Sequence, residues 1–153
     1  QARTESRPRT GGLLEKTPFD ATWFHFVRDD HPRGDLVRWR ALRFEPVLRE
    51  RVIGLRSPWG RDELASKIGR ERFGLFARAR FDVPSAGPYN LVTISDDGVR
   101  VMIDGKTVLE NWSWHPATRD VVELQLAAGS HELEVEYFQL DGAATLTIDL
   151  DPK

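Results

Sequence analysis

The feature that most constrains the fold of this chain is a period-two alternation of apolar and polar residues. In residues 73–83, every second position is apolar, and shorter runs repeat the pattern at residues 99–103, 122–126, 133–137 and 146–150. Successive side chains of a strand point to opposite faces of its sheet, so each run predicts a strand with one buried face. The alternation therefore predicts a fold built mainly from half-buried strands.

Glycine-containing dipeptides separate these predicted strands, at Asp97-Gly98, Asp104-Gly105, Gly129-Ser130 and Asp141-Gly142. Glycine tolerates positive φ, so such dipeptides are typical of the tight turns that join neighbouring strands in hairpins. Several short strands without helices between them favour an antiparallel sandwich or barrel over a parallel α/β sheet. The sequence therefore predicts an all-β fold.

The first half of the chain carries weaker signals. Residues 23–27 predict one strand, and residues 36–44 predict a second, because alternate positions there are apolar, at Val37, Trp39 and Ala41. Residues 58–69 are the one segment that predicts a short helix.

Residues 1–18 have the composition of an arm or linker, since they are polar and basic and include two glycines and two prolines. We therefore place the folded domain at residues 19–153. Leu13 and Leu14 interrupt the polar composition. We expect both to be buried, on this domain or against a protein partner that the arm contacts.

Length and composition narrow the classes of protein further. With 153 residues, 40% of them hydrophobic, the chain suits one soluble domain with its own core. It has no cysteine, which excludes disulfides, thiolate metal sites and cysteine nucleophiles. No segment approaches the roughly 18 consecutive apolar residues of a membrane-spanning helix, so we expect no membrane span.

Charge is divided unevenly along the chain. Residues 1–80 contain 18 Lys and Arg against 11 Asp and Glu, whereas residues 81–153 contain 4 against 13. A basic half can bind a polyanion such as nucleic acid or an acidic glycan. The alternative, which we favour, is pairing between arginines of one predicted strand and glutamates of another, namely Arg78 and Arg80 with Glu132, Glu134 and Glu136. We therefore expect no nucleic-acid partner.

Five motifs follow one another in the second half, at residues 72–84, 87–89, 95–106, 111–115 and 126–142. They are a long strand ending in Phe-Asp-Val-Pro, a Gly-Pro-Tyr, a Ser-Asp-Asp-Gly turn with an Ile-Asp-Gly-Lys hairpin, an Asn-Trp with a nearby His, and closing strands with a His and a Tyr. In this order they resemble a PA14 domain, the module named after the anthrax protective antigen. The resemblance implies an antiparallel β-sandwich of the PA14 type with at most one short helix.

The resemblance also implies a binding site. In sugar-binding members, paired aspartates joined by a cis peptide hold a calcium ion, which binds hydroxyls of a terminal sugar; here the pair is Asp96 and Asp97. Calcium takes about six to eight oxygen ligands, so a second loop must contribute. By resemblance that loop is 139–142, where Gln139 or Asp141 would replace the asparagine of sugar-binding members. The residues alone leave an alternative open, in which the aspartates sit in a hairpin turn and cap local backbone amides.

Aromatic residues near the predicted site have two interpretations. Trp112 and Trp114 alternate on one predicted strand face, where they could form a sugar-stacking platform with His115 or Trp59. Tryptophans in such positions also seal sandwich cores, and that interpretation is the stronger one for Trp112.

Several observations argue against catalysis. The four histidines lack metal-ligand spacing, and the chain has no nucleophile elbow or phosphate-binding loop. Neighbouring aspartates cannot flank a glycosidic bond at the required separation.

Two functions therefore remain. The first is a non-catalytic carbohydrate-binding module, assisted by calcium, whose expected partner is a glycan or polysaccharide and whose ligand-binding residues are Asp96, Asp97, Trp114, His115 and Asp141. The second is a structural or assembly module that docks onto a larger complex. Both imply a secreted, cell-surface or periplasmic location.

Overall fold

The computed structural model describes residues 12–56, 68–69, 71–141 and 144–153. The strands are β1 (Pro18–His25), β2 (Leu48–Ile53), β3 (Leu55–Arg56), β4 (Phe73–Val83), β5 (Gly87–Asp96), β6 (Gly98–Ile103), β7 (Lys106–Asn111), β8 (Thr118–Leu126), β9 (Gly129–Gln139) and β10 (Thr145–Pro152). Between β1 and β2 lie the α-helix α1 (Leu36–Ala41) and the 3-10 helices η1 (Arg28–Asp30) and η2 (Leu42–Phe44). Among the described helices, none has the length and apolar composition needed to cross a membrane.

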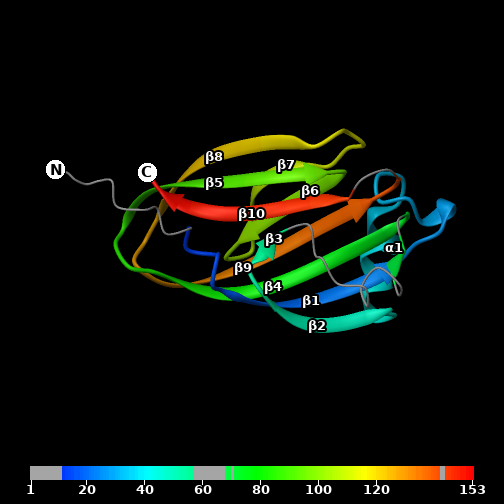
Figure 1. The fold of residues 1–153 in the computed structure, drawn as a ribbon, viewed down its shortest axis with the longest axis horizontal. Coiled ribbons are helices and arrows are strands. Elements are labelled where there is room, and N and C mark those ends of the chain that lie inside the picture. The colour runs from blue at the N-terminus through cyan, green and yellow to red at the C-terminus, as the bar shows by residue number, and fades with distance from the viewer. Residues whose placement is uncertain (1–11, 57–67, 70, 142–143) are drawn as a thin grey trace.

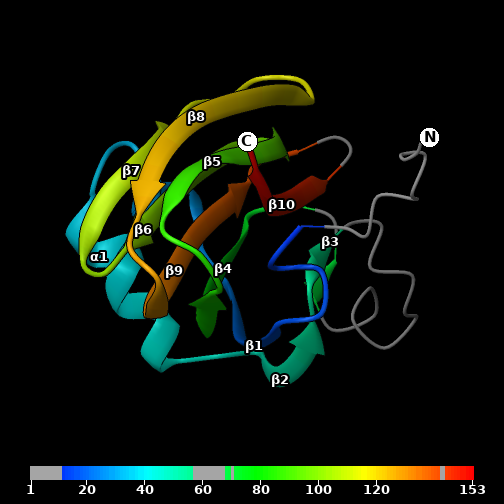
Figure 2. The same ribbon diagram turned by 90° about the vertical axis from the view of Figure 1, so that its left-hand side faces the viewer.

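The strands form two sheets that face each other, as Figures 1 and 2 show. The larger sheet has the order β2-β1-β4-β9-β6-β7 and the smaller one the order β3-β10-β5-β8, and the paired strands run antiparallel. The predicted β-sandwich is therefore confirmed.

The core lies between the sheets, where the predicted apolar faces meet. Phe81, Val101, Val135 and Ile148 are buried there. Leu124 is half-buried and packs against the same cluster, because its strand, β8, lies at the edge of the smaller sheet. For the five runs predicted in the second half of the chain, the alternation therefore identified the side that faces the core.

The strand predicted over residues 36–44 is wrong, since this segment forms α1 and η2. The Asp35 carboxylate caps the helix by accepting a hydrogen bond from the backbone N–H of Arg38 (3.1 Å). Helical geometry turns Val37 and Trp39 to different sides, so Val37 is 80% exposed and Trp39 is fully buried. The helix predicted over 58–69 lies largely outside the described residues.

A second apolar cluster covers part of the outer face of the larger sheet, beneath α1. It contains Phe24, Phe26, Trp39 and Phe138. Two glycines make room for these rings. A Cβ on Gly74 would lie 2.5 Å from the Phe24 ring, and one on Gly98 would lie 2.1 Å from the Phe138 ring.

The turn dipeptides join strands in two different ways. Asp104-Gly105 closes a hairpin, since β6 and β7 are neighbours in one sheet. The other connections, β5 to β6, β8 to β9 and β9 to β10, cross between the sheets. The hairpins predicted at Asp97-Gly98, Gly129-Ser130 and Asp141-Gly142 are therefore wrong, because a turn dipeptide does not specify which sheet the next strand joins.

The described part of the N-terminal segment docks on β10. The backbone N–H groups of Gly12 and Leu14 donate to the Asp149 carboxylate at 2.9 and 3.1 Å, and the N–H of Leu13 donates to the Leu150 carbonyl at 2.9 Å. Leu14 is buried in the core, and Leu13 is half-buried against it. The prediction of a buried Leu14 is confirmed, and its contact is with this domain.

Pairing between β4 and β9 brings the arginines and glutamates together, as predicted. Arg78 lies opposite Glu134 and Arg80 opposite Glu132 in the strand register. Arg78 lies 3.5 Å from Glu134, and Arg80 lies 3.3 Å from Glu132. Internal pairing therefore accounts for part of the uneven charge distribution.

Candidate functional site

The predicted aspartate pair lies where the chain crosses from one sheet to the other. Asp96 ends β5, Gly98 begins β6, and Asp97 alone connects them. The peptide bond between Asp96 and Asp97 is cis, as the calcium hypothesis expected. The hairpin-turn alternative fails here, because β5 and β6 belong to different sheets. The predicted turn also relied on a positive φ at Gly98, which Gly98 does not adopt. The lack of a side chain at Gly98 makes room for the Phe138 ring.

The Asp97 carboxylate joins two loops that are distant in sequence. It is buried, and its Oδ1 accepts a hydrogen bond from the backbone N–H of His115 (3.2 Å). Its Oδ2 accepts from the N–H of Leu140 (2.8 Å). The amides that Asp97 caps are thus not local ones. It fixes the β7–β8 loop and the β9–β10 loop beside the aspartate pair.

Asp96 lies in a strongly negative environment. Burial, followed by the charge of Asp97 and a hydrogen bond with its carboxylate, raises the pKa of Asp96 to about 6, and the charge of Asp141 adds to this. The hydroxyl of Tyr137 donates to the Asp96 carbonyl at 2.6 Å. Burial, with the charges of Asp97 and Asp96, also raises the pKa of that hydroxyl well above its ordinary value.

The two loops bring the other predicted residues to the aspartates. Trp114 is 64% exposed, and its indole Nε1 donates to Asp141 Oδ1 at 3.2 Å. His115 engages the Pro116 carbonyl through Nδ1 at 2.6 Å, while its Nε2 is buried without a hydrogen-bond partner among the described residues. We name this group, Asp96, Asp97, Asp141, Trp114 and His115, the carboxylate site.

The remaining predictions for the site have mixed outcomes. Gln139 is buried, and its side-chain amide donates to the Asp141 carbonyl at 2.8 Å, so it holds the loop that carries Asp141. The prediction that Trp112 and Trp114 share a strand face is wrong, since β7 ends at Asn111 and both residues lie in the loop that follows. Trp59 lies outside the described residues.

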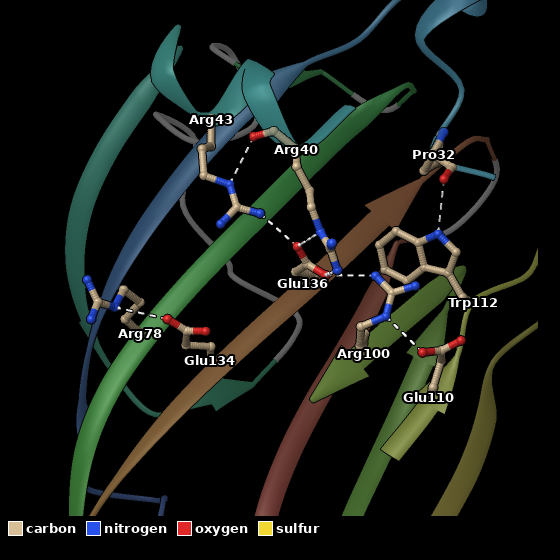
Figure 3. A network of polar contacts seen from close by, with 9 residues as sticks. All are labelled: Pro32, Arg40, Arg43, Arg78, Arg100, Glu110, Trp112, Glu134 and Glu136. Carbon is tan, nitrogen blue, oxygen red and sulfur yellow. Dashed lines mark hydrogen bonds and ion pairs between the residues drawn. The ribbon is translucent and has the colours of Figure 1, made fainter. Parts of the chain in front are cut away.

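Trp112 packs against the second apolar cluster, in line with the core interpretation favoured for it, and so anchors that loop. Its ring contacts Trp39 and Phe138 edge to face, and its Nε1 donates to the Pro32 carbonyl at 3.2 Å. The guanidinium of Arg100 lies over the same ring at 4.1 Å. These contacts, part of which Figure 3 shows, fix the loop two residues before Trp114.

Arg100 in turn belongs to a cluster around the buried Glu136, also shown in Figure 3. Glu136 accepts four hydrogen bonds of 2.7 to 2.9 Å from the guanidinium groups of Arg40, Arg43 and Arg100. Glu110 pairs with the other side of Arg100 at 2.9 Å. The cluster connects α1 and η2 to β9 and β6.

The donor set of the carboxylate site fits a hard divalent cation in charge and in ligand type. Its oxygens come from three aspartates, and none of the three forms an ion pair with a Lys or Arg in the described part of the chain. Carboxylate and carbonyl oxygens are the ligands that calcium prefers. Within the described residues, however, no three His, Asp or Glu side chains converge closely enough to hold a metal by themselves. Asp96 and Asp97 would hold the ion, with an oxygen of Gln139 or Asp141 and water oxygens completing its shell.

The carboxylate site reaches the surface through Trp114 and Asp141, although its Asp97 carboxylate is buried. Two cavities of about 390 and 440 Å³ among the described residues are lined by other parts of the chain, near Arg72 and His131. Because Trp114 and Asp141 are exposed and line neither of these cavities, a large partner can contact them as well as a small one.

Comparison with known proteins identifies relatives of the chain. The family model of the PA14 domain matches residues 45–152. An anti-sigma-I factor from Acetivibrio thermocellus is 25% identical over 112 residues, which are 72% of this chain and 16% of the relative. The chain thus spans about one-sixth of the length of that relative.

Several solved structures share the fold, including the following two. An anti-sigma factor domain-containing protein superposes with a TM-score of 0.70 at 20% identity, covering 93% of this chain and 44% of the other. A PA14 sugar-binding domain from an RTX adhesin superposes with a TM-score of 0.59 at 19% identity, covering 88% of this chain and 89% of the other.

Proposed function

This chain belongs to the PA14 domain family, and we propose that it is a non-catalytic module that binds carbohydrate through the carboxylate site, assisted by calcium. The observation that carries the proposal is that three connections between strands meet at carboxylates with which no Lys or Arg of the described residues forms an ion pair. Asp96 and Asp97 come from the β5–β6 connection, Trp114 and His115 from the β7–β8 loop, and Asp141 from the β9–β10 loop.

Each part of the site has a role that suits a sugar. A cation at Asp96 and Asp97 would supply the charge that binds vicinal hydroxyl oxygens. The exposed ring of Trp114, oriented by its hydrogen bond to Asp141, offers an apolar face on which a sugar ring can stack. The similarity to a sugar-binding PA14 domain of an adhesin supports this class of ligand. A glycan-binding role would place the chain in a secreted, cell-surface or periplasmic protein.

Binding to a glycan array tests the proposal. We expect the wild-type chain to bind one class of glycan in calcium and to lose binding in excess chelator. Trp114→Ala should weaken binding to that class by roughly 5-fold or more, since one stacking ring contributes about 1–3 kcal/mol by analogy with other stacking ligands. Val37→Ala, which changes an apolar residue of comparable exposure on α1, serves as the control. Equal binding of wild type and Trp114→Ala would contradict the proposal.

Calcium itself is tested by thermal unfolding. A ligand that binds only the folded state raises the melting temperature by mass action. We expect calcium to raise the melting temperature of the wild type, and the double substitution of Asp96 and Asp97 by alanine to abolish this rise. Ionic strength is held constant, so that screening of the surface charges does not imitate binding. Identical curves in calcium and chelator would exclude the calcium-assisted mechanism.

A second candidate function is assembly onto a larger complex. Val37 on α1 and Phe44 on η2 are 80% and 76% exposed, so this segment offers apolar side chains that a protein partner could cover. The similarity to anti-sigma factor proteins, which are longer than this chain, supports a role as one part of a larger protein. Failure of every glycan to bind, with calcium present, would favour this function over the first.

A further inference from the structure

Strand β8 ends the smaller sheet with an open edge. In the described part of the chain it pairs with β5 along Thr118–Leu126, and its other side faces outward, as its position at the border of Figure 1 shows. The edge of a sheet presents unpaired backbone N–H and C=O groups, which can pair with another strand. At nine residues, β8 is a long edge strand.

The outward side chains of β8 have a self-complementary order of charge. Arg119, Val121 and Glu123 alternate with inward residues and are exposed, and Val121 keeps 45% of its surface accessible. Antiparallel pairing of two copies of β8 about Val121 places each Arg119 opposite Glu123 of the other copy, and the two valines opposite each other. Opposite charges and β-branched pairs in directly facing positions stabilise a sheet.

The two charged residues of this pairing differ in their present contacts. Among the described residues, Arg119 forms no ion pair, and Glu123 contacts the exposed Lys153 at 2.5 Å on the same face. The pairing would therefore give Arg119 a carboxylate partner.

The other sheet edges fit a second copy less well. Self-pairing of β2 about Glu50 or Arg51 would set arginine opposite arginine, and β3 has only two residues. In β7, Glu110 is held by Arg100, and a register shift interrupts its pairing with β6.

From the open edge and this order of charge we infer that two copies of the chain associate through β8, antiparallel and centred on Val121, in one continuous eight-stranded sheet. The inference is independent of the proposed carbohydrate binding. A dimer of this kind carries two carboxylate sites, so it would also bind a multivalent glycan more tightly than one copy does.

Sedimentation velocity over a wide concentration range tests the inference. We expect the wild type to dimerise as its concentration rises. Arg119→Glu sets glutamate against glutamate twice, and Glu123→Arg sets arginine against arginine twice, so each variant should weaken dimerisation by about 10-fold or more. Arg49→Glu, a charge reversal on the exposed side of β2, should dimerise as the wild type does.

A mixture of the two weakened variants gives the decisive result. Arg119→Glu and Glu123→Arg are complementary in the proposed register, because every facing pair in their heterodimer joins a glutamate and an arginine. Mixing should therefore restore the dimer, and circular dichroism should show both variants folded. A wild type that stays monomeric at every concentration overturns the inference. A mixture that stays monomeric while the wild type dimerises overturns this register.

Discussion

Replacing Glu136 by glutamine should destabilise the chain strongly, because three arginines share this one buried carboxylate. Glu136 is 2% exposed and accepts four hydrogen bonds of 2.7 to 2.9 Å, from Arg40, Arg43 and Arg100. Arg100 is itself 7% exposed, so losing the carboxylate leaves a buried positive charge whose one remaining ion-pair partner among the described residues is the half-exposed Glu110. Removing one partner of a buried ion pair costs about 3–5 kcal/mol. We expect Glu136→Gln to lower the free energy of unfolding by this amount.

The matched control lies two residues earlier on the same strand. Glu134 pairs with Arg78 at 3.5 Å, and both side chains are solvent-accessible, so Glu134→Gln should cost less than about 1 kcal/mol. Both variants carry the same chemical change, and Figure 3 shows both pairs. Urea unfolding at neutral pH, followed by tryptophan fluorescence, measures the two costs. Equal costs for the two variants would refute the assignment of Glu136 as the centre of a stabilising cluster.

The same cluster predicts a dependence on pH. Burial raises the pKa of Glu136, but hydrogen bonds from Arg40 and Arg100 outweigh it, so the net pKa in the folded state is lowered. A lowered carboxylate pKa contributes stability that is present above the unfolded pKa and is lost as pH falls through the folded pKa. The difference in stability between wild type and Glu136→Gln should therefore shrink in acid.

Three further predictions concern other parts of the chain. Leu14→Ala should lower the free energy of unfolding in urea by about 2–5 kcal/mol, because the Leu14 side chain is buried in the core. Gly98→Ala should cost about 1–3 kcal/mol in the same assay, since its Cβ would meet a buried ring at 2.1 Å, whereas Gly34→Ala, with neighbours at 3.7 Å, should cost far less. Hydrogen bonds with a backbone carbonyl and then with the Asp104 carboxylate raise the pKa of His131 in the folded chain. The stability that protonated His131 contributes should therefore be lost as pH rises through the folded pKa. Melting temperatures across that range should fall less for Asp104→Asn than for the wild type.

Period-two alternation predicted the strands that have one buried face. The bounds of β4, residues 73–83, agree with the predicted run, because burial between two sheets imposes the pattern on every second residue. The same signal failed at α1, where six residues are too few to distinguish a period of 2 from one of 3.6. Asp35 was the available signal, since it caps the helix directly before Leu36.

Contacts across the fold could not be predicted from local patterns. Glu136 lies on the predicted outward face of β9, but α1 and η2 cover that face at this point, so the residue is buried. The sequence places Asp97, His115 and Leu140 far apart, and only the folded chain shows that the Asp97 carboxylate accepts from both backbone amides. The motifs indicated which residues belong to the carboxylate site, whereas the packing determines how they are held.

Nuclear magnetic resonance mapping of a bound glycan tests the central claim most directly. The backbone amides of His115 and Leu140 both donate to Asp97, and the indole N–H of Trp114 donates to Asp141, so their resonances report on the carboxylate site. Titration of the isotopically labelled chain with the array-selected glycan, in calcium, should shift these signals first and leave those of β2 unchanged. The account predicts that excess chelator reverses the shifts. Shifts confined to α1 and η2, or none at any glycan concentration, would contradict it.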